Sequence, residues 1–436
     1  MTDRSRGRRM GAMSKPGKRQ WEFKPKFRAR LYSWNGSAKA AKNLRAAVSE
    51  IRKAYKSDPL EAVEAAVYLM GRFWPAFQDI DSSSGSLGGA VNATIDKLLP
   101  LVIDAPADEP LRKKWTCRLF EAVCDDGVEY LGRLTEQWDR ICATDSLRGC
   151  WGEEFLPLTE KALKSRRDDY YYFIGTSACL SCLLESGRYD ELRRLLDLDD
   201  PPFWHYESYW AEALLRQGRI DDAIRHARSL LPGDDDDDLD GFHAYSPDAL
   251  EIKRFCEQTL YDVGRRREAY EQYSLAAQPD TTYLNHFRSL QRRYPEFEPR
   301  EILMDLIEKS GRPKQAWFSS ARKCELYNIA LQCAESGPVN PSTLATAARD
   351  TLGSHPDFAW RVSLLAVKYL LVDYVDVSEH DVVMAVRHLI EGARSAGHLD
   401  QALAALRDVL DLRKKAQKIP GIVKEELKRL GCPAPR

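Results

Sequence analysis

Aromatic rings alternate with positive charges near the start of the chain, a combination suited to binding single-stranded nucleic acid. The rings are Trp21, Phe23, Phe27, Tyr32 and Trp34, and the cations among them are Lys24, Lys26, Arg28 and Arg30. Such cations neutralise phosphates, and such rings stack on bases. An alternative is that the rings pack on the protein while the charges stay in solvent.

The charge of this region departs from that of an ordinary helical protein. Residues 1–57 contain 17 Lys and Arg against three acidic residues, a net charge of +14, although the whole chain has a formal charge of -1. This asymmetry predicts an arm that meets nucleic acid or an acidic protein surface. The first 20 residues lack apolar periodicity, which predicts disorder when they are free. Deleting residues 1–30 is therefore expected to leave the fold intact.

Cysteine spacing argues against a zinc site. Cys179 and Cys182 form a CxxC pair, but no second pair follows, and structural zinc needs four ligands. The pair falls in a helical pattern on the side that faces the core, where free Cys behaves as a small hydrophobe. We therefore predict no metal and no other cofactor. Ten cysteines without regular spacing also indicate reduced thiols in the cytoplasm.

Two loop-like stretches suggest ligand chemistry without completing a motif. Residues 81–92 read DSSSGSLGGAVN, and glycines before a helix can expose N–H groups to phosphate. The stretch lacks the Lys of a P-loop, so a capped helix–helix loop with closely packed glycines is the other interpretation. Residues 234–240 read DDDDDLD, like the start of a calcium loop, but Pro247 stands where the bidentate Glu belongs. A solvated acidic loop at 233–246 is expected.

No motif nominates a reaction. The sequence has no HExxH and no GxSxG, and no run of 18 apolar residues that would span a membrane. The N-terminus has positive charge but no apolar segment of the kind found in secretory signals. An enzyme whose site is assembled between domains stays open as a third hypothesis, since catalytic groups converge in space and not in sequence.

The body of the chain is predicted to be helical throughout. Leu44, Val48, Ile51 and Tyr55 recur at helical spacing within 36–56, leaving the cations Lys42, Arg45, Arg52 and Lys53 largely on the other faces as contacts for an anionic partner. Asp58-Pro59-Leu60-Glu61 combines an N-cap, a first-turn Pro and a capping-box Glu. Further helical patterns cover about 89–104, 108–124, 127–143 and 153–165.

From about residue 168 a short pattern recurs, in which a Gly is followed five residues later by a small or apolar residue. The pairs are Gly187 with Leu192, Gly218 with Ala223, Gly264 with Ala269, Gly311 with Ala316, and Gly397 with Ala402, with a weaker copy at Gly353 and Phe358. Gly permits a left-handed turn between two helices, and Ala lets them approach closely. Each unit is therefore predicted to be a helical hairpin that stacks on the next.

These units resemble the tetratricopeptide repeat (TPR) family. The best copy spans 204–232, where Trp210, Ala211 and Leu214 precede the Gly, and Ala223 and Ala227 follow it. The resemblance covers about 168–412 and implies a right-handed solenoid with a concave binding face and no chemistry of its own. The whole chain also resembles a type of bacterial helical-repeat protein, a resemblance that implies no activity.

Aromatic residues gather in and before the second repeat unit. Tyr171, Trp204, Tyr206 and Tyr209 are candidates for a binding groove, because Tyr and Trp serve as anchors, although repeat core is the alternative role.

The predicted organisation is an all-α chain in successive parts. These are a basic disordered arm at 1–30, a helical domain at 31–166, a TPR-like solenoid at 167–416 and a C-terminal tail at 417–436. The leading functional hypothesis is a non-enzymatic scaffold that binds a protein partner in its groove. The second is a nucleic-acid-binding accessory factor that uses the arm and the first helix.

Overall fold

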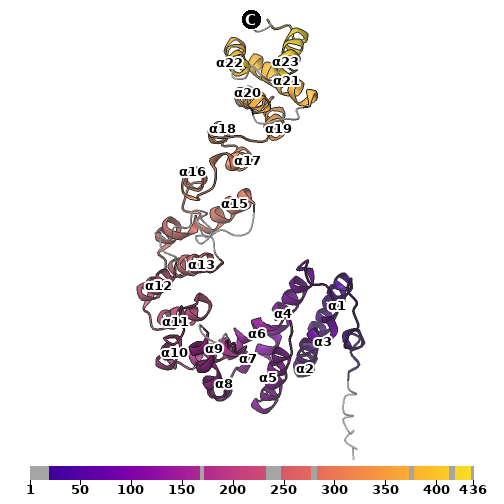
Figure 1. Ribbon diagram of the computed structural model, residues 1–436, viewed down its shortest axis with the longest axis vertical. Coiled ribbons are helices and arrows are strands. Elements are labelled where there is room, and N and C mark those ends of the chain that lie inside the picture. The colour runs from indigo at the N-terminus through magenta and orange to yellow at the C-terminus, as the bar shows by residue number, and fades with distance from the viewer. Residues whose placement is uncertain are drawn as a thin grey trace, which may run out of the picture. The chain divides into compact units, whose positions relative to one another are not determined.

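The computed structural model is helical in every part that it describes (Figure 1). The described residues are 19–166, 171–231, 247–275, 282–372, 378–411 and 418–433. These residues contain no β-strand, which confirms the all-α class, and none of their helices is long and apolar enough to cross a bilayer. Contacts divide the chain into two compact units, residues 1–230 and 231–436.

The described part of unit 1 contains a 3₁₀-helix and twelve α-helices. In chain order they are η1 (Lys24–Phe27), α1 (Ser37–Tyr55), α2 (Pro59–Met70), α3 (Phe73–Phe77), α4 (Ser86–Asp104), α5 (Glu109–Cys124), α6 (Gly132–Thr135), α7 (Trp138–Cys142), α8 (Asp145–Ser165), α9 (Thr176–Glu185), α10 (Tyr189–Leu196), α11 (Trp204–Arg216) and α12 (Ile220–Ser229).

The described part of unit 2 contains the α-helices α13 to α23, one π-helix and one 3₁₀-helix. They are α13 (Pro247–Asp262), α14 (Arg266–Ala269), the π-helix η3 (Tyr270–Ser274), α15 (Tyr283–Arg293), α16 (Pro299–Lys309), the 3₁₀-helix η4 (Lys314–Trp317), α17 (Phe318–Lys323), α18 (Tyr327–Glu335), α19 (Pro341–Thr351), α20 (Pro356–Val372), α21 (Glu379–Ala396), α22 (Leu399–Asp411) and α23 (Lys418–Arg429).

Local signals placed most of the early helices correctly. Asp58 caps α2, since its Oδ1 accepts the N–H of Glu61 at 3.0 Å. The helix expected at 127–143 is instead two short helices, α6 and α7, with left-handed residues at Glu129 and Ala143. Helix α8 begins eight residues before the predicted start, because the Thr144 hydroxyl caps it by accepting the N–H of Leu147 at 3.3 Å.

Residues 19–30 belong to the folded unit, which corrects the prediction of a disordered arm over 1–30. Trp21, Phe23 and Phe27 are buried, and the Phe27 ring lies 5.9 Å from that of Phe77 in α3. The Glu50 carboxylate of α1 accepts the backbone N–H groups of Glu22 and Phe23 at 2.9 and 3.2 Å. The rings therefore pack on the protein, as the alternative interpretation of this segment proposed. Residues 1–18 lie outside the described residues.

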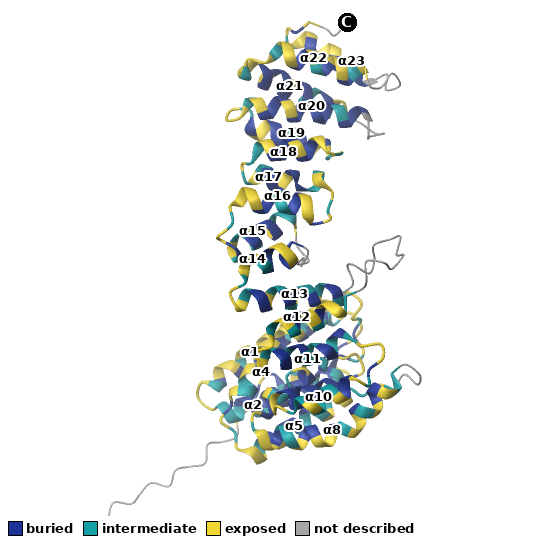
Figure 2. Ribbon diagram, turned by 90° about the vertical axis from the view of Figure 1, so that its left-hand side faces the viewer, coloured by how far each residue is buried: buried dark blue, intermediate teal, exposed yellow. Residues whose placement is uncertain are grey.

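The division between the two units falls at 230–231, not at the boundary predicted near 166. Helix α8 packs along α9, so the first hairpins of the predicted repeat region share one continuous core with the preceding helices. That core runs from Trp21 to Ala213. Figure 2 shows buried residues on α10 and α11 within this unit.

The repeat glycines adopt the left-handed conformation that the pattern predicted. Gly187, Gly218, Gly264, Gly311 and Gly397 have φ values between 67° and 83°, whereas Gly353 of the weaker copy does not have a positive φ. The residue after Gly218 closes the turn, since the N–H of Arg219 bonds to the carbonyl of Leu214 at 2.9 Å. This six-residue bond is the Schellman motif that ends helices at a left-handed residue.

One turn of the same form was missed because it has no glycine. Glu325 occupies the left-handed position with φ of 60°, and the N–H of Leu326 bonds to the carbonyl of Ala321 at 3.0 Å. Ala330 follows five residues later and is fully buried. The α17–α18 hairpin therefore has the same local form as the glycine units. Further along unit 2, α18 packs on α20, α19 on α21, and α20 on α22, so successive hairpins contact one another.

Replacing Gly218 with Val is expected to lower the free energy of unfolding by about 1–3 kcal/mol, because a β-branched residue is strained at positive φ. No atom lies within 4 Å of a Cβ built at Gly218, so the loss would come from the backbone and not from a clash. Gly353→Val is the matched control, since that site is equally open and has no positive φ. Equal melting curves for the two variants would contradict the role given to the turn.

Candidate functional site

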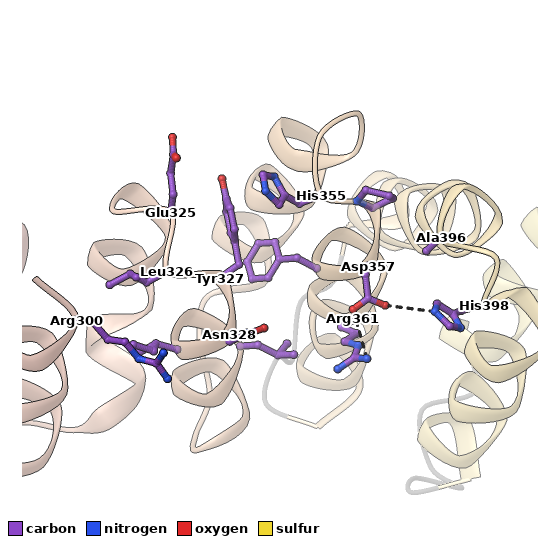
Figure 3. Close-up of a pocket in the computed structure, with 14 residues that line it drawn as sticks. Arg300, Glu325, Leu326, Tyr327, Asn328, His355, Asp357, Arg361, Ala396 and His398 are labelled. Carbon is purple, nitrogen blue, oxygen red and sulfur yellow. Dashed lines mark ion pairs between the residues drawn. The ribbon is translucent and has the colours of Figure 1, made fainter.

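One candidate site is an open pocket of about 500 Å³ within unit 2, called here the α18/α20/α22 pocket. Three helices begin at its wall (Figure 3), with Leu326, His355 and His398 as the residues that precede α18, α20 and α22. The first N–H groups of a helix have no partner within it, so each helix start carries a partial positive charge. Three such starts in one pocket favour an anionic group.

Charged side chains of both signs line this pocket. Asp357, at the start of α20, accepts the indole N–H of Trp360 at 3.0 Å and lies 3.3 Å from the Arg361 guanidinium and 4.0 Å from His398 Nε2. Arg300 and Glu325 also line the pocket, and neither has an ion-pair partner among the described residues. Figure 3 shows Asp357 between Arg361 and His398, with Arg300 on the opposite side.

The pocket also contains an apolar cluster. The Tyr327 ring lies 4.2 Å from the His355 imidazole and 4.9 Å from the Phe358 ring, measured between centroids. Ile329 and Leu331 of α18 complete the apolar part of the lining. The pocket thus offers a cluster of rings together with a guanidinium, which suits a peptide segment that carries an apolar and an acidic side chain.

The aromatic groove residues predicted from the sequence lie in unit 1, and most of their side chains are part of its buried core. Trp204 and Tyr206 are buried, and burial raises the pKa of Tyr206 to about 12 and that of Tyr209 further. Tyr171 lies with Tyr206 on a small apolar pocket of about 160 Å³, and Lys161 Nζ stands 4.3 Å from the Tyr171 ring. These four side chains do not form one open groove.

The predicted cationic residues separate into two groups. Lys24 lies over the Tyr68 ring at 4.7 Å, whereas Lys26, Arg28 and Arg30 extend along the segment that packs on unit 1. On α1, Arg45, Arg52 and Lys53 line one open hollow, which they share with Lys56, a cation of the same basic helical segment, and with Lys97, a cation absent from the prediction. Lys42 is exposed on the same helix but does not line the hollow. Lys97 was missed because it lies on α4, far away in sequence.

The CxxC cysteines are core residues. Cys179 and Cys182 are buried in α9, and burial raises the pKa of the Cys179 thiol to about 12. A hydrogen bond to Cys142 and burial raise the pKa of Cys182 as well. Both thiols are therefore protonated at neutral pH. No group of three or more potential metal ligands occurs in the described part of the chain, and the acidic residues 234–240 lie outside it.

One serine–histidine contact links α9 and α11, with Ser177 Oγ 3.0 Å from His205 Nε2. A nucleophilic serine needs such a base, and the base needs a third group that orients it. No described carboxylate contacts His205, so the pair does not complete a triad.

Comparison with known proteins found no match. No protein-family model matches the chain, and no curated protein matches its sequence.

Proposed function

We propose that the protein is a non-enzymatic helical-repeat scaffold that binds a segment of a partner protein in the α18/α20/α22 pocket. The observation that carries this proposal is the convergence of three helix starts on a pocket with both a cluster of aromatic rings and a guanidinium. The recurring hairpin turns support a TPR-like solenoid, an architecture that presents such surfaces to other proteins.

The partner segment is expected to place an acidic side chain near Arg361 and an apolar side chain against Tyr327 and Phe358. Helix starts and guanidinium groups favour a carboxylate, and Asp357 holds Arg361 in place by an ion pair at 3.3 Å. Burial of an apolar anchor would supply most of the affinity, since aromatic pockets dominate binding energy at protein interfaces.

Site-specific photocrosslinking in extracts of the native host tests this proposal. Asn328 lies in the lining and is exposed, whereas Lys424 of α23 is exposed and does not line the pocket, so the two positions form a matched pair for the crosslinking residue. We expect one dominant protein adduct from position 328 only. Arg361→Glu should abolish that adduct by reversing the charge that faces the partner.

The adduct is also expected to vanish with Tyr327→Ala and to be competed by a synthetic peptide taken from the crosslinked segment. A peptide with its acidic residues changed to Gln should compete at least tenfold less well, since a charged hydrogen bond contributes about 1.5–3 kcal/mol. Equal adducts from positions 328 and 424, or adducts insensitive to Arg361→Glu, would contradict the pocket as the binding site.

A further inference from the structure

A second surface, on unit 1, has a different chemistry and lies along the two packed helices α1 and α4. Two open hollows adjoin there, of about 540 and 750 Å³, and Arg45 lines both. We call them together the α1/α4 groove. Because α1 has 19 residues and a helix rises about 1.5 Å per residue, the α1 side of the groove extends for roughly 28 Å.

One end of the α1/α4 groove is strongly basic. Arg45, Arg52, Lys53, Lys56 and Lys97 are all exposed around the first hollow. None of the five makes an ion pair or a side-chain hydrogen bond with another described residue, although most arginines of the neighbouring repeat helices are paired. Cations that are left without partners along one groove create a positive potential that attracts a polyanion.

The other end of the groove presents a flat aromatic ring. Trp34 is 66% exposed, the most exposed large apolar side chain among the described residues, and it lines the second hollow with Arg45. The other rings of its segment are buried, so the exposure of Trp34 is particular to this position. An indole beside a guanidinium is the pair of groups that stacks on a nucleobase while neutralising its phosphate.

Gly89 of the DSSSGSLGGAVN stretch lines the second hollow. The structure corrects the expectation that the glycines of this stretch allow close helix packing, since no atom lies within 4 Å of a Cβ built at Gly88 or Gly89. Gly inside a helix is destabilising relative to Ala by roughly 0.5–1 kcal/mol, so packing does not explain them. Because Gly89 has no side chain, a ligand can instead approach the backbone closely beside Ser84 and Ser86.

We infer that the α1/α4 groove binds single-stranded nucleic acid, with the five cations on phosphates and Trp34 stacked on a base. The carboxylates of an acidic peptide would pair with the cations, but they would not stack on the exposed ring of Trp34. A duplex would hide its bases from the ring. The one carboxylate in the second hollow, Asp81, is held by the N–H of Ser83 at 2.9 Å. Charge and ring together therefore favour a single strand.

Fluorescence anisotropy of the full chain with labelled dodecamers tests the inference. The probes are oligo(dT), oligo(U), a mixed-sequence duplex and a poly-glutamate peptide of equal charge, each titrated at several salt concentrations. We expect the single strands to bind best, with log affinity falling by about 0.7 per phosphate contact for each decade of salt. Lys53→Gln with Lys56→Gln should reduce that slope by about 1.4. Lys113→Gln with Lys114→Gln, on the exposed face of α5, is the matched control and should not change it.

Two further variants separate binding from folding. Trp34→Ala should weaken single-strand binding about tenfold or more, without changing the salt slope, since stacking is not ionic. Gly89→Glu should abolish binding without lowering the melting temperature, because the site has room for a side chain. Binding lost on deletion of residues 1–18 but unaffected by the groove variants would overturn the inference. So would tighter binding of the duplex or the peptide, or no binding at low salt.

Discussion

Replacing Arg112 with Leu is expected to lower the free energy of unfolding of unit 1 by about 3–5 kcal/mol, since each buried carbonyl left without a donor costs about 1–3 kcal/mol. The Arg112 side chain is 3% exposed. Its Nη1 donates to the carbonyls of Val102 and Ile141 at 3.0 Å each, and its Nη2 to those of Ile103 and Ala105 at 3.3 and 2.6 Å.

The expected loss of stability arises at the C-terminal end of α4. The last carbonyls of a helix have no partner within it, and those of α4 face the interior. A single guanidinium satisfies two of them, those of Val102 and Ile103, together with the carbonyl of Ala105 just after the helix, and it also holds α7 through Ile141. Burial lowers the pKa of Arg112, but the group stays charged at neutral pH because an Arg side chain does not lose its proton in proteins.

Urea unfolding followed by circular dichroism, with hydrogen exchange to assign the transition to unit 1, measures this effect. Arg133→Leu is the matched control, since Arg133 pairs with Asp96 at the surface at 3.2 Å and such pairs contribute at most about 1 kcal/mol. A loss of less than 1 kcal/mol for Arg112→Leu would show that water replaces the guanidinium at these carbonyls.

Replacing Phe27 with Ala is expected to destabilise unit 1 by about 3–5 kcal/mol, the usual loss for a buried Phe. Phe27 is fully buried, and its ring contacts those of Phe23, Tyr32 and Phe77. Its carbonyl also accepts a hydrogen bond from Arg72 Nε at 3.0 Å. The segment therefore covers the core around α3.

A pair of truncations separates this role from that of the preceding charges. Deleting residues 1–30 removes Trp21, Phe23 and Phe27 and should lower the melting temperature sharply, contrary to the expectation from the sequence. Deleting residues 1–18 removes none of these contacts and should leave the melting temperature unchanged. Thermal melting of both truncations and of Phe27→Ala, beside the exposed control Leu31→Ala, measures the effect. Equal melting of the two truncations would contradict the packing of the segment.

Features set by neighbours in sequence could be predicted. The Asp58 cap, the periodicity of α1 and the left-handed Gly218 and Gly264 follow from steric and hydrogen-bonding rules that act over a few residues. The same rules predicted the all-α class. They missed Glu325, because a left-handed turn without glycine has no distinctive residue and is held by its flanking helices.

The candidate sites depended on contacts between distant segments. The sequence nominated Arg45, Arg52 and Lys53 as cations, but only the packing of α1 on α4 adds Lys97 and leaves Trp34 exposed beside them. The alternation of rings and charges in residues 21–34 suits either stacking on a ligand or burial in the core, and a side chain's own type does not decide between them. That choice depends on whether a helix from elsewhere covers the ring: Phe77 of α3 meets Phe27, and no such ring meets Trp34 among the described residues. Helices form from local periodicity, whereas the exposure of a side chain depends on which helix packs against it.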